Sequence, residues 1–122
     1  MRMWWVLAAA AAANTIGVPA TAQSSLDGRW SVLVVTEKGT CDRAYRYPVR
    51  IRRGRVGHAD PANTSFDIRG RVAANGWIRV TVSRGSQRAD GTGRLARGHG
   101  TGKWKSSKGE CSGYWSAERR AE

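Results

Sequence analysis

The 122-residue chain has few acidic residues, few histidines and no long apolar segment. Nine Asp and Glu stand against 21 Lys and Arg, which gives a net charge of +12 at pH 7. The longest apolar run, Trp4 to Ala13, is about half of the ~20 residues that a membrane-spanning helix needs, so we expect no membrane span. His58 and His99 are the two histidines, and neither shows metal-ligand spacing with a cysteine. We therefore expect no metal and no cofactor.

The first residues have the three parts of a secretory signal peptide. Met1-Arg2-Met3 supplies a positive start, the apolar run follows, and Ala20-Thr21-Ala22 is a small-x-small cleavage site. We predict a signal peptide over 1–22 and a secreted or periplasmic protein. Residues 23–122 then remain as one domain of 100 residues with a net charge of +11.

The charge of this domain indicates anionic partners, since net charge governs association and solubility rather than fold. An anionic polysaccharide, a lipid headgroup or an acidic protein would fit, whereas nucleic acid is not expected in that compartment. A second interpretation is compositional. The domain has 16 Arg against 4 Lys and is rich in Ala and Gly, which a GC-rich genome produces by default.

Both cysteines, Cys41 and Cys111, lie in the predicted domain. An even pair in an exported chain predicts a disulfide. The bridge would close a loop of about 70 residues, for which the chain-entropy model gives ~4 kcal/mol of stabilisation.

Short stretches of alternating apolar and polar residues, separated by Gly, Asn and Ser, recur along the domain. This pattern is typical of antiparallel strands. We predict an all-β fold of about eight strands, either a small up-and-down β-barrel or a strongly curved meander. The first three strands are expected at Arg29–Thr36, Cys41–Arg52 and Arg55–His58.

The middle of the chain allows a register to be predicted. With Ala74-Asn75-Gly76 as a three-residue hairpin loop, Val72 pairs with Ile78, and two further pairs, Gly70 with Val80 and Ile68 with Val82, fall on the same apolar face. A turn at Gly85-Ser86 continues this face by pairing Val82 with Ala89, Val80 with Gly91 and Ile78 with Gly93.

A Gly-x-Trp pattern occurs three times, ending at Trp30, Trp104 and Trp115. In a strand the Gly and the Trp point to one face, so each Gly makes room for a ring from a neighbouring strand. A turn at Ser107-Lys108 would pair Gly102 with Gly113 and Trp104 with Cys111. We expect the three tryptophans and the disulfide to form one core cluster.

Gly28-Arg29-Trp30 at the first strand, with Arg119 or Arg120 near the end of the last, resembles the G-x-W motif and closing Arg of lipocalin-like and other calycin barrels. The domain is also similar to small exported β-barrel proteins of alphaproteobacteria. The calycin resemblance implies that the Trp closes one barrel end and that the Arg packs across it. A barrel of this size is expected to be filled by its own side chains, without a roomy ligand cavity.

The outward face of the predicted hairpins carries Arg69, Arg71, Arg79, Arg88 and Arg94, with Asp67 and Asp90 as the only acids. Arg71 would lie opposite Arg79, a like-charge pair that costs stability, and Trp77 would lie beside Arg94. Basic rows with an aromatic residue can hold anions and stack rings. The alternative is a solvated face with no ligand. We take the anion-binding set to be Arg69, Arg71, Trp77, Arg79 and Arg94.

These features predict an exported, non-catalytic binding protein of the cell envelope that holds an anionic glycan or lipid headgroup. One alternative is a protein-interaction barrel, similar to secreted protease inhibitors that use an N-terminal arm, here Gln23 to Asp27. A hydrolase is disfavoured, because neither His58 near Asp60 nor His99, expected in a solvated loop, belongs to a catalytic motif.

Overall fold

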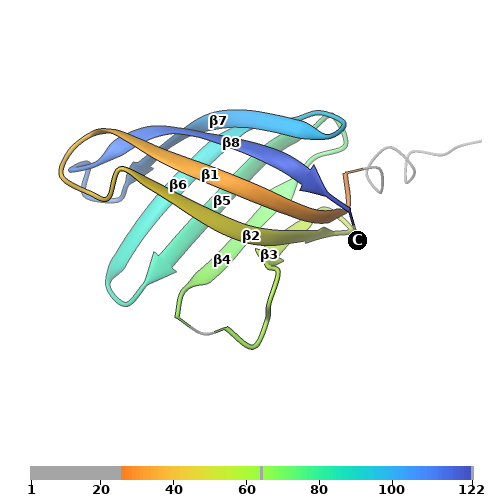
Figure 1. Ribbon diagram of the computed structural model, residues 1–122, viewed down its shortest axis with the longest axis horizontal. Helices are drawn as coiled ribbons and strands as arrows, with labels where there is room; N and C mark the ends of the chain where they lie inside the picture. The colour runs from red at the N-terminus through yellow and green to blue at the C-terminus, as the bar shows by residue number, and fades with distance from the viewer. Residues whose placement is uncertain (1–25, 64, 122) are drawn as a thin grey trace, which may run out of the picture.

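The chain forms a closed eight-stranded antiparallel barrel with up-and-down topology (Figure 1). The computed structural model describes residues 26–63 and 65–121. Each strand pairs with its neighbours in sequence, and β1 closes the barrel against β8. The strands are β1 (Gly28–Lys38), β2 (Ala44–Arg52), β3 (Arg55–His58), β4 (Asp67–Val72), β5 (Trp77–Arg84), β6 (Gln87–Leu95), β7 (His99–Ser106) and β8 (Ser112–Arg120).

The all-β prediction is therefore confirmed in its barrel form. The predicted signal peptide over 1–22, and Gln23 to Ser25 of the arm, lie outside the described residues. No helix in the part of the chain that the structure describes is long and apolar enough to span a membrane.

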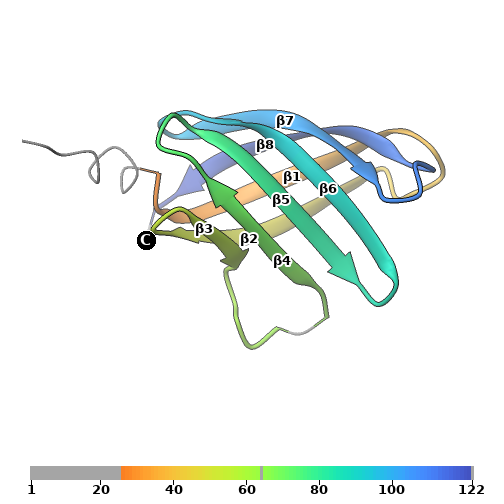
Figure 2. The same cartoon turned by 180° about the vertical axis from the view of Figure 1, so that it is seen from behind.

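β4, β5 and β6 lie side by side in the wall of the barrel (Figure 2), and the register of the β4–β5 and β5–β6 hairpins is the predicted one. Ile68, Val72 and Ile78 point inward and are buried, because these apolar positions alternate with exposed arginines along each strand. Gly76 has φ 95°, which fits its predicted left-handed position in the loop.

The β7–β8 register differs from the prediction by two residues. Gly102 lies opposite Trp115 and Trp104 lies opposite Gly113, not opposite Cys111. The loop is longer than the predicted turn, because Ser106 N–H donates to the Cys111 carbonyl and only then does β8 begin. A shift of two residues keeps every side chain on its predicted face.

Other boundaries differ as well. β1 runs from Gly28 to Lys38 rather than from Arg29 to Thr36. The second strand begins at Ala44, because Cys41 belongs to the loop before it. His99 is the first residue of β7 rather than part of a loop, since Ala96 N–H bonds to its carbonyl; its side chain is exposed.

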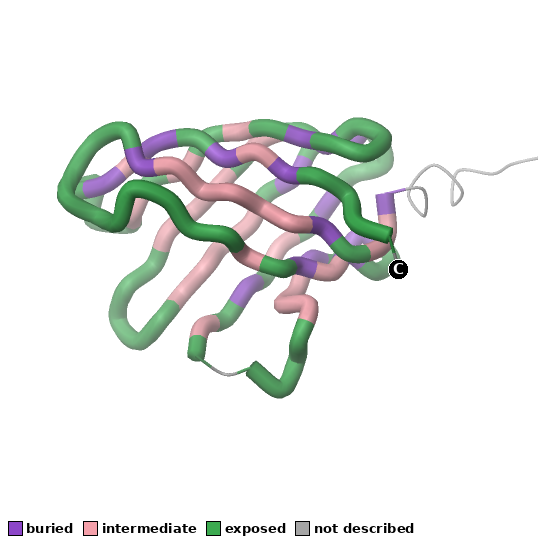
Figure 3. The backbone as a smooth tube through the Cα atoms, viewed as in Figure 1, coloured by how far each residue is buried: buried purple, intermediate pink, exposed green. Residues whose placement is uncertain are grey.

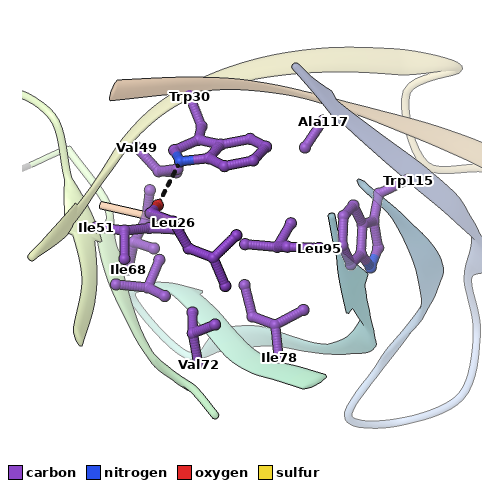
Figure 4. Packing of buried hydrophobic residues seen from close by; sticks show 11 residues of the cluster. Leu26, Trp30, Val49, Ile51, Ile68, Val72, Ile78, Leu95, Trp115 and Ala117 are labelled. Carbon is purple, nitrogen blue, oxygen red and sulfur yellow. Dashed lines mark hydrogen bonds between the residues drawn. The ribbon is translucent and has the colours of Figure 1, made fainter. Parts of the chain in front are cut away.

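The cluster of buried apolar residues fills one end of the barrel, which we call the closed end (Figure 4). Thr36 and Cys111 are buried separately towards the other end, as the purple segments there show (Figure 3). Trp30 is 2% exposed, and its indole N–H donates to the Leu26 carbonyl at 3.0 Å. Leu26 itself is buried inside the ring of strands. Arg119 lies opposite Trp30 on β8 and donates to the Asp27 carbonyl. The segment before β1 therefore seals this end.

Cys41 and Cys111 form the predicted disulfide, with their Cα atoms 6.2 Å apart. A structural disulfide indicates an oxidising, non-cytosolic compartment. The bridge ties the β1–β2 loop to the start of β8, at the end of the barrel opposite to Trp30.

The prediction of one cluster of three tryptophans and the disulfide is therefore wrong. Trp30 and Trp115 are buried core residues, whereas Trp104 is only partly buried and packs against that core. Trp30 lies near the start of the 11-residue strand β1 and Cys41 follows its end. At about 3.3 Å per residue these groups are too far apart to touch.

Candidate functional site

The half of the barrel away from the closed end holds an open cavity of about 700 Å³, which we call the cup. Its walls carry Val32, Val34, Tyr47, Val80, Val82 and Trp104, and its floor includes Trp30, Ile78, Leu95 and Trp115. Figure 4 shows the floor residues. The expectation of a filled interior is therefore wrong.

The cup exists because the strands extend beyond the bulky core residues. Towards the mouth the inward positions are small, such as Val34, Val82 and Ala89. The large rings lie nearer the closed end. Trp115 packs over Gly93 and Gly102, where an added methyl group would overlap its ring. Valine and alanine fill much less of the lumen than tryptophan would, so space remains in the upper half.

Arg84 is the inward-facing charge at the mouth. It continues the inward series of Ile78, Val80 and Val82 on β5 and lies opposite Gln87. Arg88 lies 3.8 Å from Asp90, so these two rim charges offset each other, whereas Glu110 accepts a hydrogen bond from Ser106 and keeps its negative charge. Arg84 and Lys108 have no ion pair with any residue of 26–63 or 65–121. The mouth is therefore apolar inside and positive at its edge.

Tyr45 and Tyr47 stand on the β2 wall of the cup. Burial raises the pKa of Tyr47 above its ordinary value, Tyr45 adds to the rise, and the nearby charge of Arg84 opposes it. Burial also raises the pKa of Tyr45, with the Asp42 carboxylate adding to the effect. Both phenols stay neutral near neutral pH. The O–H of Tyr45 is directed to Asp42, whereas that of Tyr47 can donate a hydrogen bond to a ligand.

The predicted anion-binding residues all lie exposed on the outer wall, away from the cup. Trp77 is 53% exposed and lies opposite Arg94. The guanidinium carbon of Arg94 is 5.3 Å from the centroid of the Trp77 ring. Arg71 lies directly opposite Arg79, as predicted. Arg69 forms an ion pair with Asp67 at 2.8 Å. The strand register places all five residues on the same outer face of the sheet. Anion binding at this face stays a prediction.

The two histidines do not meet a carboxylate in a catalytic geometry. His58 is the last residue of β3, opposite Val49, and its Nδ1 accepts a hydrogen bond from the backbone N–H of Asp60 at 2.9 Å. Its Nε2 is buried without a partner among the described residues, beside the Phe66 ring. His99 lies opposite Glu118 on the exposed surface.

Sequence reasoning missed the cup and its rim charge. The alternation predicts that Val80 and Val82 lie on an apolar face, but a pattern of alternation does not show whether the lumen is full. Arg84 could have been found, since it continues the inward parity of Val80 and Val82 to the end of β5. A charge at an inward position next to a turn is a signal for a barrel mouth.

Comparisons with known proteins give a fold and no activity. No family model matches the chain, and no curated protein matches it in sequence. Among solved structures, the chain is similar to a redesigned β-barrel, with a TM-score of 0.56 and 14% identity over 83% of this chain and 96% of that one. At this identity the likeness shows the barrel fold alone.

Proposed function

We propose that this protein is an exported, non-catalytic binding protein whose cup takes an amphiphile with one apolar chain and an anionic head. The observation that carries the proposal is the open cavity of about 700 Å³. Ligand sites commonly enclose about 300–1,000 Å³ and combine apolar walls with a few polar groups. The apolar chain would enter towards Trp104 and Trp115, and the head would stay at the rim near Arg84.

The charge and the compartment support this assignment. The disulfide requires an oxidising environment, and the sequence of residues 1–22 is that of an export signal, so a secreted or periplasmic location fits. In such a compartment lipids and their breakdown products are available as amphiphiles. Arg84 has no acidic partner among the described residues and is free to pair with an anionic head.

Titration with dodecanoate tests the proposal. Binding quenches or shifts the fluorescence of Trp104, which lines the cup, and we expect a Kd of about 1 to 100 μM from the usual free energy per ligand atom. Dodecanol, with the same chain and no charge, should bind about three- to fivefold more weakly, because an exposed ion pair contributes up to about 1 kcal/mol. Arg84→Gln should remove that difference.

A matched pair of variants controls for folding and for surface binding. Ala89→Trp places a large ring inside the cup and should abolish dodecanoate binding. Ala44→Trp places the same ring on the outer face of β2, since its neighbour Tyr45 points inward. Ala44→Trp should leave the Kd unchanged. Equal loss in both variants, or binding that survives in Ala89→Trp, would overturn the proposal.

A further inference from the structure

A row of arginines crosses the outer wall at the closed end of the barrel. The pairing of strands places Arg52 opposite Arg55, Arg55 opposite Arg71, and Arg71 opposite Arg79. These four residues, one on each of β2 to β5, define the arginine row. All four side chains are exposed. Neighbouring strands lie about 4.8 Å apart, so the row extends over roughly 15 Å.

The row lacks any internal neutralisation. Like charges directly opposite each other destabilise a sheet, and here three such contacts follow one another. None of the four arginines forms an ion pair or a side-chain hydrogen bond within residues 26–63 and 65–121. Among the nearby acids, Asp67 pairs with Arg69, Asp90 interacts with Thr81 and Arg88, and Asp27 accepts a hydrogen bond from the backbone N–H of Arg53 rather than from an arginine side chain of the row. Packing therefore gives no reason for this arrangement.

We infer that the arginine row binds an acidic polysaccharide along its length. A chain with a charged group on successive sugars can place one anion near each guanidinium, and Arg is suited to bidentate contacts with such groups. Trp77 lies two residues from Arg79 on the same face of β5 and is 53% exposed, so its ring offers a platform for a sugar.

The shape of the wall favours a flexible polymer over a membrane. The row crosses four adjacent strands of a closed eight-stranded barrel, so it turns around the wall through three of the eight strand-to-strand steps (Figure 2). A flat bilayer touches a curved wall along one strip, so the outer arginines of the row would have to bend towards it to make contact. A polymer can follow the curve. The oxidising compartment indicated by the disulfide also favours a surface polysaccharide over nucleic acid.

Affinity for heparin as a function of salt tests this inference. The double variant Arg71→Gln/Arg79→Gln removes the centre of the row. The control Arg43→Gln/Arg97→Gln removes two exposed charges from the β1–β2 and β6–β7 loops. We expect the row variant to lower the slope of log affinity against log salt by about 0.7 to 0.9 per arginine, with about a tenfold weaker Kd at 0.15 M salt. The control should lose less than about threefold.

Stability and competing ligands complete the experiment. The row variant should unfold at the same or a higher temperature, because like-charge contacts are relieved. Equal losses of heparin affinity in the two variants would show a diffuse positive field and overturn the inference.

Competing ligands are compared with heparin at equal salt. The inference would also be overturned if the protein preferred phosphatidylglycerol vesicles or a single-stranded oligonucleotide to heparin, and if the row variant lost that binding to the same extent. Dodecanoate binding in the cup should be unchanged in both variants, so this test and that of the proposed function fail separately.

Discussion

Trp30 and Trp104 share the Gly-x-Trp pattern but differ in their surroundings. Trp30 is 2% exposed and donates to the Leu26 carbonyl inside the closed end. Trp104 donates to the Val35 carbonyl at 3.0 Å, yet one side of its ring faces the cup. The pattern fixed the inward direction of both rings. Their depth depends on how far along the barrel each lies, which local sequence does not encode.

This difference predicts unequal effects of removing each ring. Trp30→Ala should lower the free energy of unfolding by about 3 to 5 kcal/mol, because it leaves a cavity in a close-packed region. Trp104→Ala enlarges a space that is already open to solvent and should cost clearly less. Urea unfolding of the two variants measures the difference. Equal losses would show that the upper half of the barrel is as tightly packed as the lower half.

The raised pKa of Tyr47 predicts that the folded protein loses stability at alkaline pH. Because this pKa is raised in the folded state, the folded protein holds the phenolic proton more tightly than the unfolded chain does. The contribution is complete below the unfolded pKa of about 10 and is lost as pH rises through the higher folded pKa. Tyr47→Phe should therefore flatten the fall in unfolding free energy between pH 9 and about 11. Tyr114→Phe, at an exposed outer position, is the control and should leave the fall as steep as in the parent protein.

At the scale of elements, alternation and turn chemistry were sufficient to predict the β4–β5–β6 register. Only one loop length around Asn75-Gly76 kept Val72 and Ile78 on one face, and the structure has that register. The β7–β8 register could not be fixed in this way. A shift of two residues leaves the faces of Gly102 and Trp104 unchanged, so the apolar pattern fits both registers equally well. The length of the loop before Cys111 decides between them.

The disulfide links the β1–β2 loop to the residue before β8 at the mouth of the barrel. It closes a loop of 70 residues between the β1–β2 loop and β8. We predict that Cys41→Ser/Cys111→Ser lowers the unfolding free energy by about 2 to 4 kcal/mol, because the unfolded chain gains freedom. Urea unfolding of the double variant measures the loss, and the parent protein unfolded in reductant should match it. A double variant as stable as the oxidised parent would contradict the prediction.

At the scale of the whole molecule, the sequence could predict a barrel and a basic surface, but neither the cup nor the full arginine row. The free volume of the lumen depends on the barrel diameter and on the inward side chains of all eight strands together. Whether Val34, Val82 and Ala89 leave space therefore cannot be judged from any one strand. Arg55 joins the row through two β3–β4 pairs that follow a loop of eight residues. Such long-range pairings are not encoded in local alternation, whereas the Arg71–Arg79 hairpin contact is.

The two proposed sites lie at opposite ends of the barrel, which predicts that they act independently. The cup opens beside the disulfide, whereas the arginine row crosses the wall near the turns at Arg53-Gly54 and Ala74-Asn75-Gly76. Independent sites have a coupling factor near one. Saturation with heparin should therefore change the Kd of dodecanoate by less than about twofold at 0.15 M salt. The reverse titration should agree, because coupling between two binding events is reciprocal. Mutual exclusion of the two probes would place both anionic groups at one site, with Arg84 at the mouth as the residue to test next.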